Sequence, residues 1–384
     1  MTSRIVVVGG GPVGLSFAIA AAKLPGASVT VIERAADGQR SLPSPFDHRV
    51  YALSPTSLQF LADLGVVPDP ARAAPVRSMQ VCGDQAGSRL DFTDGQPLAT
   101  IVEHASLMRA LESRLAQIER IGLRRGAAAQ SLDSTELGER RLTLTDGSKL
   151  TADLLVAADG SRSQIRQLAA IAVDSRDYDS DGVVANFRCE RAHGDVARQW
   201  FGSDSVLAYL PLPGKHISMV WSMASAAAAQ TAALGPDQFC AAVAAAGHHQ
   251  LGSLALVSPV ERFPLTRTTA QDWVQPGLAL IGDAAHAVHP LAGQGVNLGF
   301  ADARKLFEVL GDRSKFSRAG DLAVLRQYER ARREAALAVG QVTDHLRSLY
   351  LSEWSFARWL RNDGVRMVNR LPIAKSVLVD YATR

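Results

Sequence analysis

The chain has few cysteines, nearly balanced charge and no long uninterrupted apolar run. Its three cysteines, Cys82, Cys189 and Cys240, are widely spaced among 384 residues and form no C-x-x-C pair. This pattern disfavours a disulfide framework, a structural zinc site and a redox dithiol, and it fits a reducing compartment. Lys and Arg total 41 against 38 for Asp and Glu, a net charge of +3 that is too small to favour nucleic-acid binding.

The N-terminal segment 5–22 is almost wholly apolar or glycine and follows Arg4, so it superficially resembles a signal peptide. Three glycines and Pro12 interrupt the run where a continuous apolar helix would be needed. No other stretch reaches the roughly 18 unbroken apolar residues of a membrane span. These absences predict a cytoplasmic protein.

What the sequence does contain begins with a glycine-rich turn. The short β-branched run 4–8 is typical of a buried parallel strand, and Gly9, Gly11 and Gly14 follow it at G-x-G-x-x-G spacing. The next segments predict a helix over 16–23 and a second strand over 29–32 that ends in Glu33. Together these features are typical of a dinucleotide-binding unit.

Each part of this unit has a physical purpose. Gly9 permits the tight turn, Gly11 lets backbone N–H groups approach a pyrophosphate, and Gly14 lets the helix pack closely on the strand. The N-terminus of the helix favours the anionic phosphates. Glu33 stands 19 residues after Gly14 (33 − 14), where an acid can accept hydrogen bonds from a ribose. This unit alone leaves NAD and FAD equally open.

Two further segments place an acid after a short apolar strand. The strand 154–157 leads to Asp159 and then to a helix with Ser163 and Arg166. The strand before Asp283 ends at that acid, and a glycine-rich turn with a helix beginning near Val296 follows. Acids at the carboxyl ends of parallel strands lie where open α/β sheets bind ligands. His286 and His289 could ligate a metal, but without a third ligand a loop-positioning role is the better interpretation, and no metal is expected.

The order of these motifs is G-x-G-x-x-G…E, then A-D-G-S-x-S-x-x-R, then G-D-A-A-H-x-x-x-P-x-x-G-Q-G-x-N-x-G. It resembles the single-component flavoprotein aromatic hydroxylases, the p-hydroxybenzoate-hydroxylase-like superfamily. Within that superfamily, the segments 48–66, 101–111, 207–213 and 360–365 are similar to the ubiquinone-biosynthesis hydroxylases.

The resemblance implies FAD as cofactor, NAD(P)H as transient reductant and O₂ as co-substrate. It places Glu33 at the adenosine ribose, and Arg49 and Arg109 along the diphosphate or ribityl chain. The full set of implied FAD-binding residues is Gly9, Gly11, Pro12, Gly14, Glu33, Arg34, Arg49, Arg109, Asp159, Asp283, Pro290, Gly293, Gln294, Gly295 and Asn297.

The expected fold is α/β, with a discontinuous Rossmann-like FAD-binding domain, an inserted and mostly antiparallel substrate domain, and a helical C-terminal tail. The FAD-binding domain is expected over 1–75, 98–175 and 266–300, the substrate domain over 76–97 and 176–265, and the tail over 301–384. Tyr209, His216 and Trp221 are expected in the sheet that roofs the pocket, in structural rather than catalytic roles. No acid or base residue can be named.

The predicted function is hydroxylation of a phenolic ring, with a polyprenyl intermediate of ubiquinone biosynthesis as substrate. Three alternatives stay open: a hydroxylase of a small soluble aromatic, a prenyl-chain reductase or halogenase on the same fold, and a non-catalytic flavin-binding scaffold in a biosynthetic complex. The apolar, aromatic and basic segment 350–384 leaves open a peripheral contact with the inner membrane face or with other ubiquinone-biosynthesis proteins, although packing on the flavin domain is favoured. A homodimer is also left open.

Overall fold

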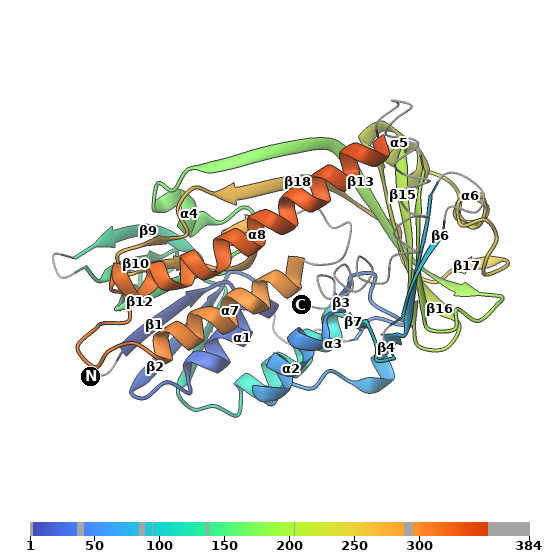
Figure 1. Ribbon diagram of the computed structural model, residues 1–384. Helices are drawn as coiled ribbons and strands as arrows, with labels where there is room; N and C mark the ends of the chain where they lie inside the picture. Colours follow the sequence, from blue (N-terminus) through green and yellow to red (C-terminus); the bar gives the residue numbers. More distant parts are fainter. Residues whose placement is uncertain are drawn as a thin grey trace.

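The computed structural model describes residues 3–36, 42–83, 89–93, 95–135, 138–202, 204–287 and 295–351. Two large sheets stand at opposite ends of the molecule, with most of the helices around the first (Figure 1). There are also two smaller antiparallel sheets of three strands each. Both contribute to the core of the first large sheet, and one of them also contributes to a separate small hydrophobic cluster. The predicted pairing of a Rossmann-like sheet with a second, mostly antiparallel sheet is therefore present.

The six-stranded sheet is built around the first predicted strand and is parallel except at its β19 edge. Its strands in spatial order are β19 (Val274–Gln275), β20 (Leu278–Leu280), β12 (Leu154–Ala157), β1 (Ser3–Val8), β2 (Ala27–Glu33) and β8 (Ile121–Arg125). The carboxyl ends of β1, β12 and β20 thus meet at one edge although they are far apart in sequence. This arrangement brings the three predicted motifs to one place.

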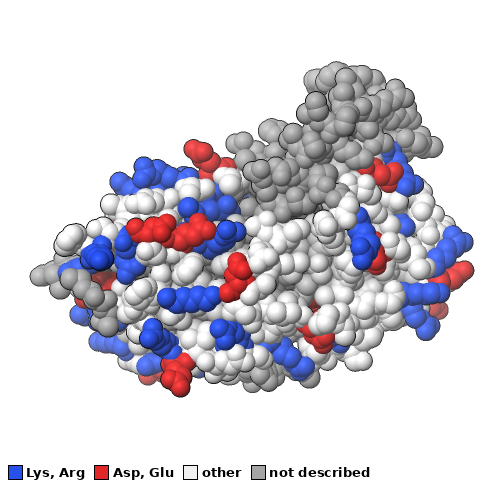
Figure 2. Space-filling model, turned by 60° about the horizontal axis from the view of Figure 1, so that its bottom comes forward, with Lys and Arg blue, Asp and Glu red and all other residues white. Residues whose placement is uncertain are grey.

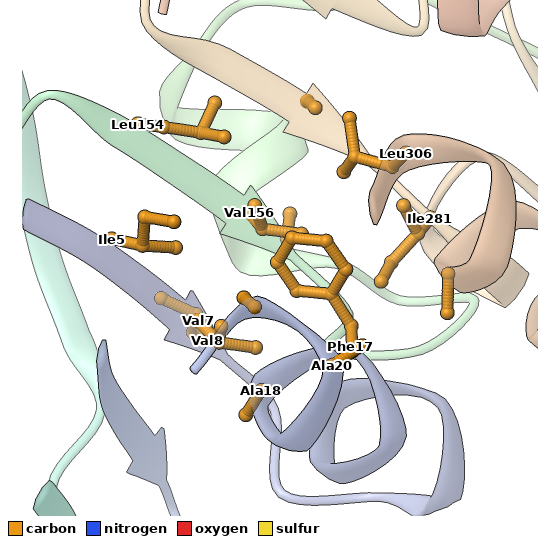
Figure 3. Close-up of a cluster of buried hydrophobic side chains, with 14 of the residues drawn as sticks. Ile5, Val7, Val8, Phe17, Ala18, Ala20, Leu154, Val156, Ile281 and Leu306 are labelled. Atoms are coloured by element: carbon orange, nitrogen blue, oxygen red, sulfur yellow. The ribbon is translucent and has the colours of Figure 1, made fainter. Parts of the chain in front are cut away.

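Helix α1 (Pro12–Ala21) packs against this sheet because its residues are small or apolar on nearly every side. Figure 3 shows Phe17 of α1 lying between side chains of β1, β12 and the segment around Ile281. Helix α1 begins at Pro12, earlier than the predicted start near Ser16, since proline at the first helical position needs no hydrogen-bond acceptor. Further helices complete this layer: α2 (Pro55–Asp63), α3 (His104–Leu115), α4 (Gln164–Leu168), α7 (Gly295–Gly311) and α8 (Leu322–Leu351).

The second large sheet has antiparallel neighbours except where β14 runs parallel to β5. Its strands are β21 (His286–Ala287), β18 (Glu261–Ala270), β13 (Val173–Cys189), β16 (His216–Ala224), β15 (Ser205–Leu212), β14 (Val196–Phe201), β5 (Ser78–Cys82) and β6 (Arg89–Thr93), with β17 (Leu254–Leu256) beside β13. Helices α5 (Ser225–Ala232) and α6 (Pro236–Ala246) cover its outer face (Figure 1).

Two three-stranded antiparallel sheets complete the fold. One joins β9 (Ala129–Ser134), β10 (Arg140–Leu144) and β11 (Lys149–Ala152), and the other joins β3 (Val50–Leu53), β7 (Ala99–Glu103) and β4 (Ala73–Val76). Single-turn 3₁₀ helices occur at η1 (Pro70–Arg72) and η2 (Gly282–Ala284). The two large sheets have separate hydrophobic cores. Strands β13 and β18 run across the expected boundaries at 175 and 265, so the domain limits stay a prediction.

On the face shown in Figure 2, basic and acidic side chains are interspersed among uncharged ones. In the described part of the chain, no helix combines the length and the apolar character needed to span a bilayer.

Candidate functional site

The glycine turn touches the end of the second motif. Gly9 has a φ of +111°, and a Cβ at this position would overlap the carbonyl oxygen of Ala158 and lie 2.8 Å from the backbone nitrogen of Asp159. At Gly14 a Cβ would overlap the carbonyl oxygen of Gly9. Gly11 differs, because a Cβ there would meet no protein atom within 4 Å. The turn is therefore closely packed at Gly9 and Gly14 and open at Gly11, next to the N-terminus of α1.

Glu33 holds this turn in place. Its Oε2 accepts a hydrogen bond of 2.6 Å from the backbone N–H of Gly10, and its Oε1 accepts one of 2.8 Å from that of Ala35. Each carboxylate oxygen can accept a second hydrogen bond, so a ribose hydroxyl could still bind here. The side chain of Arg34, the next residue, is exposed.

Asp159 carries an acceptor atom that the chain leaves without a donor. Its Oδ2 accepts from the backbone N–H groups of Gln164 and Ile165, at 2.8 and 3.1 Å. Its Oδ1 is buried and has no hydrogen-bond partner among the described residues. Ser163, predicted within the following helix, is instead the N-cap of α4, where its hydroxyl accepts from the Arg166 N–H. A buried carboxylate oxygen without a donor fits a site that a ligand hydroxyl completes.

The sequence predicted that Asp283 ends a strand, and this prediction is wrong. Strand β20 ends at Leu280, and Asp283 lies in the 3₁₀ turn η2, where the positive φ of Gly282 (+58°) redirects the chain. The turn packs on the first motif, since a Cβ at Gly282 would lie 3.3 Å from the side chain of Val13. All three motifs are therefore in contact.

The Asp283 side chain is open to solvent, yet surrounding protein desolvates it and raises its pKa. His286 and Arg49 act in the opposite direction, and Asp302 adds to the increase. Both observations fit a carboxyl group that protein surrounds on one side and leaves open on the other. Such a group is costly to ionise until a ligand donates to it.

We expect Asp283→Asn to stabilise the apoprotein at neutral pH. A raised pKa in the folded state means that the folded chain binds this proton more tightly than the unfolded chain does. The cost of ionisation is therefore absent below the unfolded pKa, grows as pH rises, and is complete above the folded pKa. Urea unfolding of apoprotein at pH 4 and pH 7.5 should show a gain for the variant only at pH 7.5. A gain of equal size at both values would contradict the titration of Asp283.

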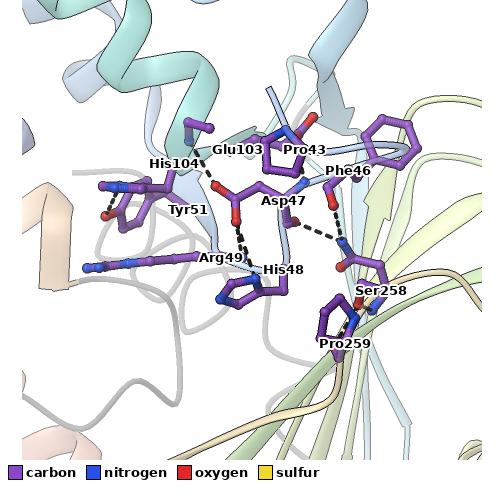
Figure 4. Close-up of polar contacts among 12 residues, drawn as sticks. Pro43, Phe46, Asp47, His48, Arg49, Tyr51, Glu103, His104, Ser258 and Pro259 are labelled. Carbon is purple, nitrogen blue, oxygen red and sulfur yellow. Dashed lines mark hydrogen bonds and ion pairs between the residues drawn. The ribbon is translucent and has the colours of Figure 1, made fainter. Parts of the chain in front are cut away.

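Arg49 follows a loop that is fixed by buried carboxylates (Figure 4). Asp47 accepts hydrogen bonds from the N–H groups of Arg49 and Ala105, both at 3.0 Å, and its own N–H donates to Glu103 at 2.6 Å. The guanidinium of Arg49 lies 5.5 Å from the ring centroid of Tyr51. The loop is therefore well placed to hold Arg49 on the side facing Asp283.

The same loop is bound to the second sheet. Asn186 of β13 donates from Nδ2 to the carbonyl oxygen of Asp47 at 2.8 Å and is fully buried. Arg72 forms two hydrogen bonds to Glu103, from Nε to Oε1 at 2.8 Å and from Nη2 to Oε2 at 2.5 Å. The Asn186 bond joins the loop to β13, and the Arg72 bonds fix the Glu103 carboxylate that accepts from the loop at Asp47.

The remaining predicted residues divide into four groups. Arg109 is exposed on α3 and forms no hydrogen bond or ion pair with the other predicted residues that the structure describes. Asn297 binds backbone, since its Oδ1 accepts from Ser54 N–H at 3.0 Å and its Nδ2 donates to the Ala52 carbonyl at 2.8 Å, which fixes α7 to β3. Gly295 begins α7, and a Cβ there would lie 4.0 Å from Asp283 Oδ1. Three predicted residues lie outside the described residues: Pro290, Gly293 and Gln294.

His286 is paired with a carboxylate. Its Nε2 lies 2.6 Å from Oδ2 of Asp302, which suits the loop-positioning role, whereas His289 lies outside the described residues. Within the described ranges, no three potential metal ligands come together. Asp302 and its partner Arg332 were missed by the sequence analysis. The signal was present: Leu298, Asp302 and Leu306 follow each other at i, i+4 and i+8, which places an acid on the buried face of a helix.

Tyr209 and Trp221 lie in the second sheet, as predicted, and their side chains point away from the flavin motifs. Both belong to the core between the second sheet and α6, and Tyr209 donates a hydrogen bond of 2.6 Å to the Val243 carbonyl. His216 does face the flavin side, where its ring contacts Phe46 edge-on. Side chains alternate along strands, so His216 lies on the face opposite to that of Tyr209 and Trp221.

The face that turns toward the flavin motifs is therefore the one that carries Asn186. Cross-strand pairing places Val184, Val220, Ala208 and Gln199 in one row on this face. The neighbouring row contains Gly182, Ser222, Val206 and Phe201. On the part of this face formed by 182–188, 197–201, 206–212 and 216–222, the basic side chains are Arg188 and His216, which pair at one end of the sheet. The central part of this face consists mostly of small or apolar side chains, with Gln199 and Ser222 as its polar members and Phe201 as its large one.

Three comparisons bear on identity. The family model for the FAD binding domain matches residues 2–343. The chain is 33% identical to 3-demethoxyubiquinol 3-hydroxylase of Escherichia coli, over 99% of this chain and 98% of the relative. It is 30% identical to ubiquinone hydroxylase UbiL of Rhodospirillum rubrum, over 98% and 89% respectively.

Among solved structures, PqsL of Pseudomonas aeruginosa has a similar fold, with a TM-score of 0.79 and 20% identity over 96% of this chain and all of that one. The open Gly11 cradle and the unpaired Asp159 oxygen fit the cofactor that the family binds. The chain belongs to the FAD-binding domain family, together with the ubiquinone-biosynthesis hydroxylases, and FAD is its cofactor.

Proposed function

We propose that the chain hydroxylates a phenolic ring that carries a polyprenyl tail, as an FAD-dependent monooxygenase of ubiquinone biosynthesis. The observation that carries the proposal is the contact between three distant motifs at one sheet edge, each with an open or unpaired group. The relatives named above, which the chain matches over nearly its full length, support the reaction and the substrate class.

The residues that would hold FAD follow from this geometry. The N-terminus of α1 and Gly11 would receive the pyrophosphate, and Glu33 the adenosine ribose. Asp159 and Asp283 would accept hydrogen bonds from the ribityl or diphosphate region. When bound, FAD supplies the redox chemistry that uses NAD(P)H and O₂. The protein contributes orientation of the ring and exclusion of water.

Arg34 and Arg109 are exposed, so each would need to fold over the ligand to reach it. Asn297 acts through backbone contacts. For the turn that includes Gly293, the proposal that it binds FAD rests on the resemblance. Membrane association, contact with other ubiquinone-biosynthesis proteins and a homodimer stay predictions, because 352–384 lie outside the described residues.

The apolar sheet face favours a prenylated substrate over a small carboxylated aromatic. A carboxylate would need a buried cation nearby, and the central rows around Val184, Val220 and Ala208 provide none among the described positions. An apolar chain, in contrast, gains free energy from contact with these side chains, at about 25 cal/mol per Å² of apolar surface buried.

We expect Ala208→Leu to weaken use of a prenylated phenol. The larger side chain fills space above the flavin motifs, so KM should rise several-fold while FAD affinity stays unchanged. Ala227→Leu, on the exposed surface of α5, is the matched control and should match the parent. Steady-state kinetics with a prenylated phenol checks this. Unchanged kinetics for both variants would mean that the substrate does not pass this face.

The function itself is tested with FAD-reconstituted protein under air. NADH or NADPH is added with a prenylated phenol, and separately with phenols and hydroxybenzoates that lack the tail. Hydroxylated prenylated product, found by mass spectrometry, is the expected result. Turnover of only the small soluble aromatics would support that alternative instead. A protein that binds FAD but consumes no NAD(P)H with any of the phenols would favour a non-catalytic scaffold.

A further inference from the structure

The turn that carries Asp283 is held at both ends by one carboxylate. Oδ2 of Asp302, in α7, accepts from the backbone N–H of Gly282 at 3.0 Å and lies 2.6 Å from Nε2 of His286. These two residues are the first and last of the segment 282–286. The other oxygen of Asp302, Oδ1, accepts a hydrogen bond of 2.8 Å from Nε of Arg332 in α8.

This carboxylate is wholly enclosed by protein. Asp302 has no exposed surface, and His286 is 3% exposed. Burial alone would raise the pKa of Asp302, but His286 and Arg332 outweigh it and hold that pKa below its ordinary value. Removing one partner would leave an uncompensated buried charge, so the three groups depend on each other.

The His286 ring has few other constraints. The indole of Trp273 stacks on it with ring centroids 4.7 Å apart, and its Nδ1 is buried without a partner among the described residues. Its orientation therefore depends on one hydrogen bond and one ring contact. Because the same oxygen of Asp302 also holds Gly282, a shift at either end moves the turn between them.

We propose that Asp302, His286 and Arg332 are positioning residues that set the direction of the Asp283 carboxyl group toward the ribityl chain of FAD. This rests on the proposed role of Asp283 in binding the cofactor. Helix α8 then takes part in the cofactor site without touching the cofactor, since Arg332 supplies the charge that keeps Asp302 ionised. Tyr328 and Glu329 add to this attachment, by donating to the Leu280 carbonyl at 2.8 Å and accepting from Trp273 N–H at 3.0 Å.

The test compares two substitutions at His286. Glutamine places its amide nitrogen near the position of histidine Nε2 and can donate to Asp302, whereas asparagine places it near Nδ1 and cannot reach. The rate of FAD release from the holoprotein is measured by the recovery of free-flavin fluorescence. We expect His286→Asn to release FAD about tenfold to 100-fold faster than the parent, as for a lost hydrogen bond to a charged group, and His286→Gln to stay within about threefold.

Equal acceleration by both variants would overturn the proposal, because the ring contact with Trp273 would then matter and the hydrogen bond would not. No acceleration by either variant would also overturn it. If His286→Asn does not fold, Arg332→Lys and Arg332→Met provide the same comparison, since lysine can still pair with Asp302. Glu308→Gln, which changes a half-exposed carboxylate on α7 that pairs with Arg304, is the control and should release FAD at the parent rate.

Failure of the proposed function gives a different pattern. If no phenol is hydroxylated but glutamine and asparagine still differ in FAD release, the positioning role stands without the substrate assignment. If Asp283→Asn releases FAD at the parent rate, the role of Asp283 is wrong, and a difference between the two His286 variants cannot then act through it.

Discussion

Gly11→Ala is expected to weaken FAD binding by about tenfold to 100-fold and to leave the fold intact. The backbone of Gly11 is extended, with φ −76° and ψ 178°, so alanine can adopt it, and the added Cβ meets no protein atom within 4 Å. That methyl group would occupy the space through which a pyrophosphate reaches the N–H groups of α1. Losing one charge-assisted hydrogen bond costs about 1.5–3 kcal/mol, which gives this range.

Gly14→Ala is the matched comparison for this result. A Cβ at Gly14 would overlap the Gly9 carbonyl oxygen, so this variant should lose both FAD and stability, by about 1–3 kcal/mol or more. Titration of apoprotein with FAD and urea unfolding of the same samples separate the two effects. For Gly11→Ala, the change in unfolding free energy should stay below about 1 kcal/mol, the usual cost of alanine at an N-cap. Parent-like FAD affinity in Gly11→Ala would show that the phosphates do not approach this turn.

Arg72→Met is expected to have the largest effect on stability, lowering the free energy of unfolding by about 3–5 kcal/mol. Glu103 has no exposed surface, and Arg72 is its cationic partner through two hydrogen bonds. Methionine replaces the volume of the side chain and removes the charge, which leaves a buried carboxylate uncompensated. Chemical denaturation at neutral pH measures the loss.

A second variant shows whether the charge is the cause. Adding Glu103→Gln to Arg72→Met removes the uncompensated carboxylate and keeps an oxygen that can accept from Asp47 N–H. Most of the lost stability should return, as a double-mutant cycle would show. Arg304→Met removes an exposed cation 3.0 Å from Glu308 and should change stability by less than about 1 kcal/mol. A double variant as unstable as Arg72→Met alone would point to lost packing rather than charge.

The sequence predicted those features that depend on neighbours in the chain. The strand 154–157 is present residue for residue as β12, and the turn at Gly9 to Gly14 has the expected close packing. Both follow from local rules, which are β-branched or apolar runs and the need for glycine where backbones touch. The family assignment rested on long motifs and is confirmed.

What the sequence analysis left open or assigned wrongly depends on distant parts of the chain. Alternation along a strand shows that Tyr209 and Trp221 share a face, but not that α6 covers that face. Asp283 was assigned to a strand end because the positive φ of Gly282 has no sequence signature beyond glycine itself. The pairing of Asp302 with Arg332 joins two helices, so no local pattern could reveal the partner.

The order of strands in the six-stranded sheet has a consequence for the synthesis of the protein. Strand β1 must pair with β12, about 150 residues later, and β12 must pair with β20, which lies more than 120 residues beyond it. A ribosome must therefore release most of the chain before the N-terminal glycine turn acquires its neighbours. Parallel pairing over such separations is slow, because loop closure costs entropy before contacts repay it. The nascent N-terminal unit should therefore be unable to retain FAD, and the cofactor should bind only after residue 300 has left the ribosome.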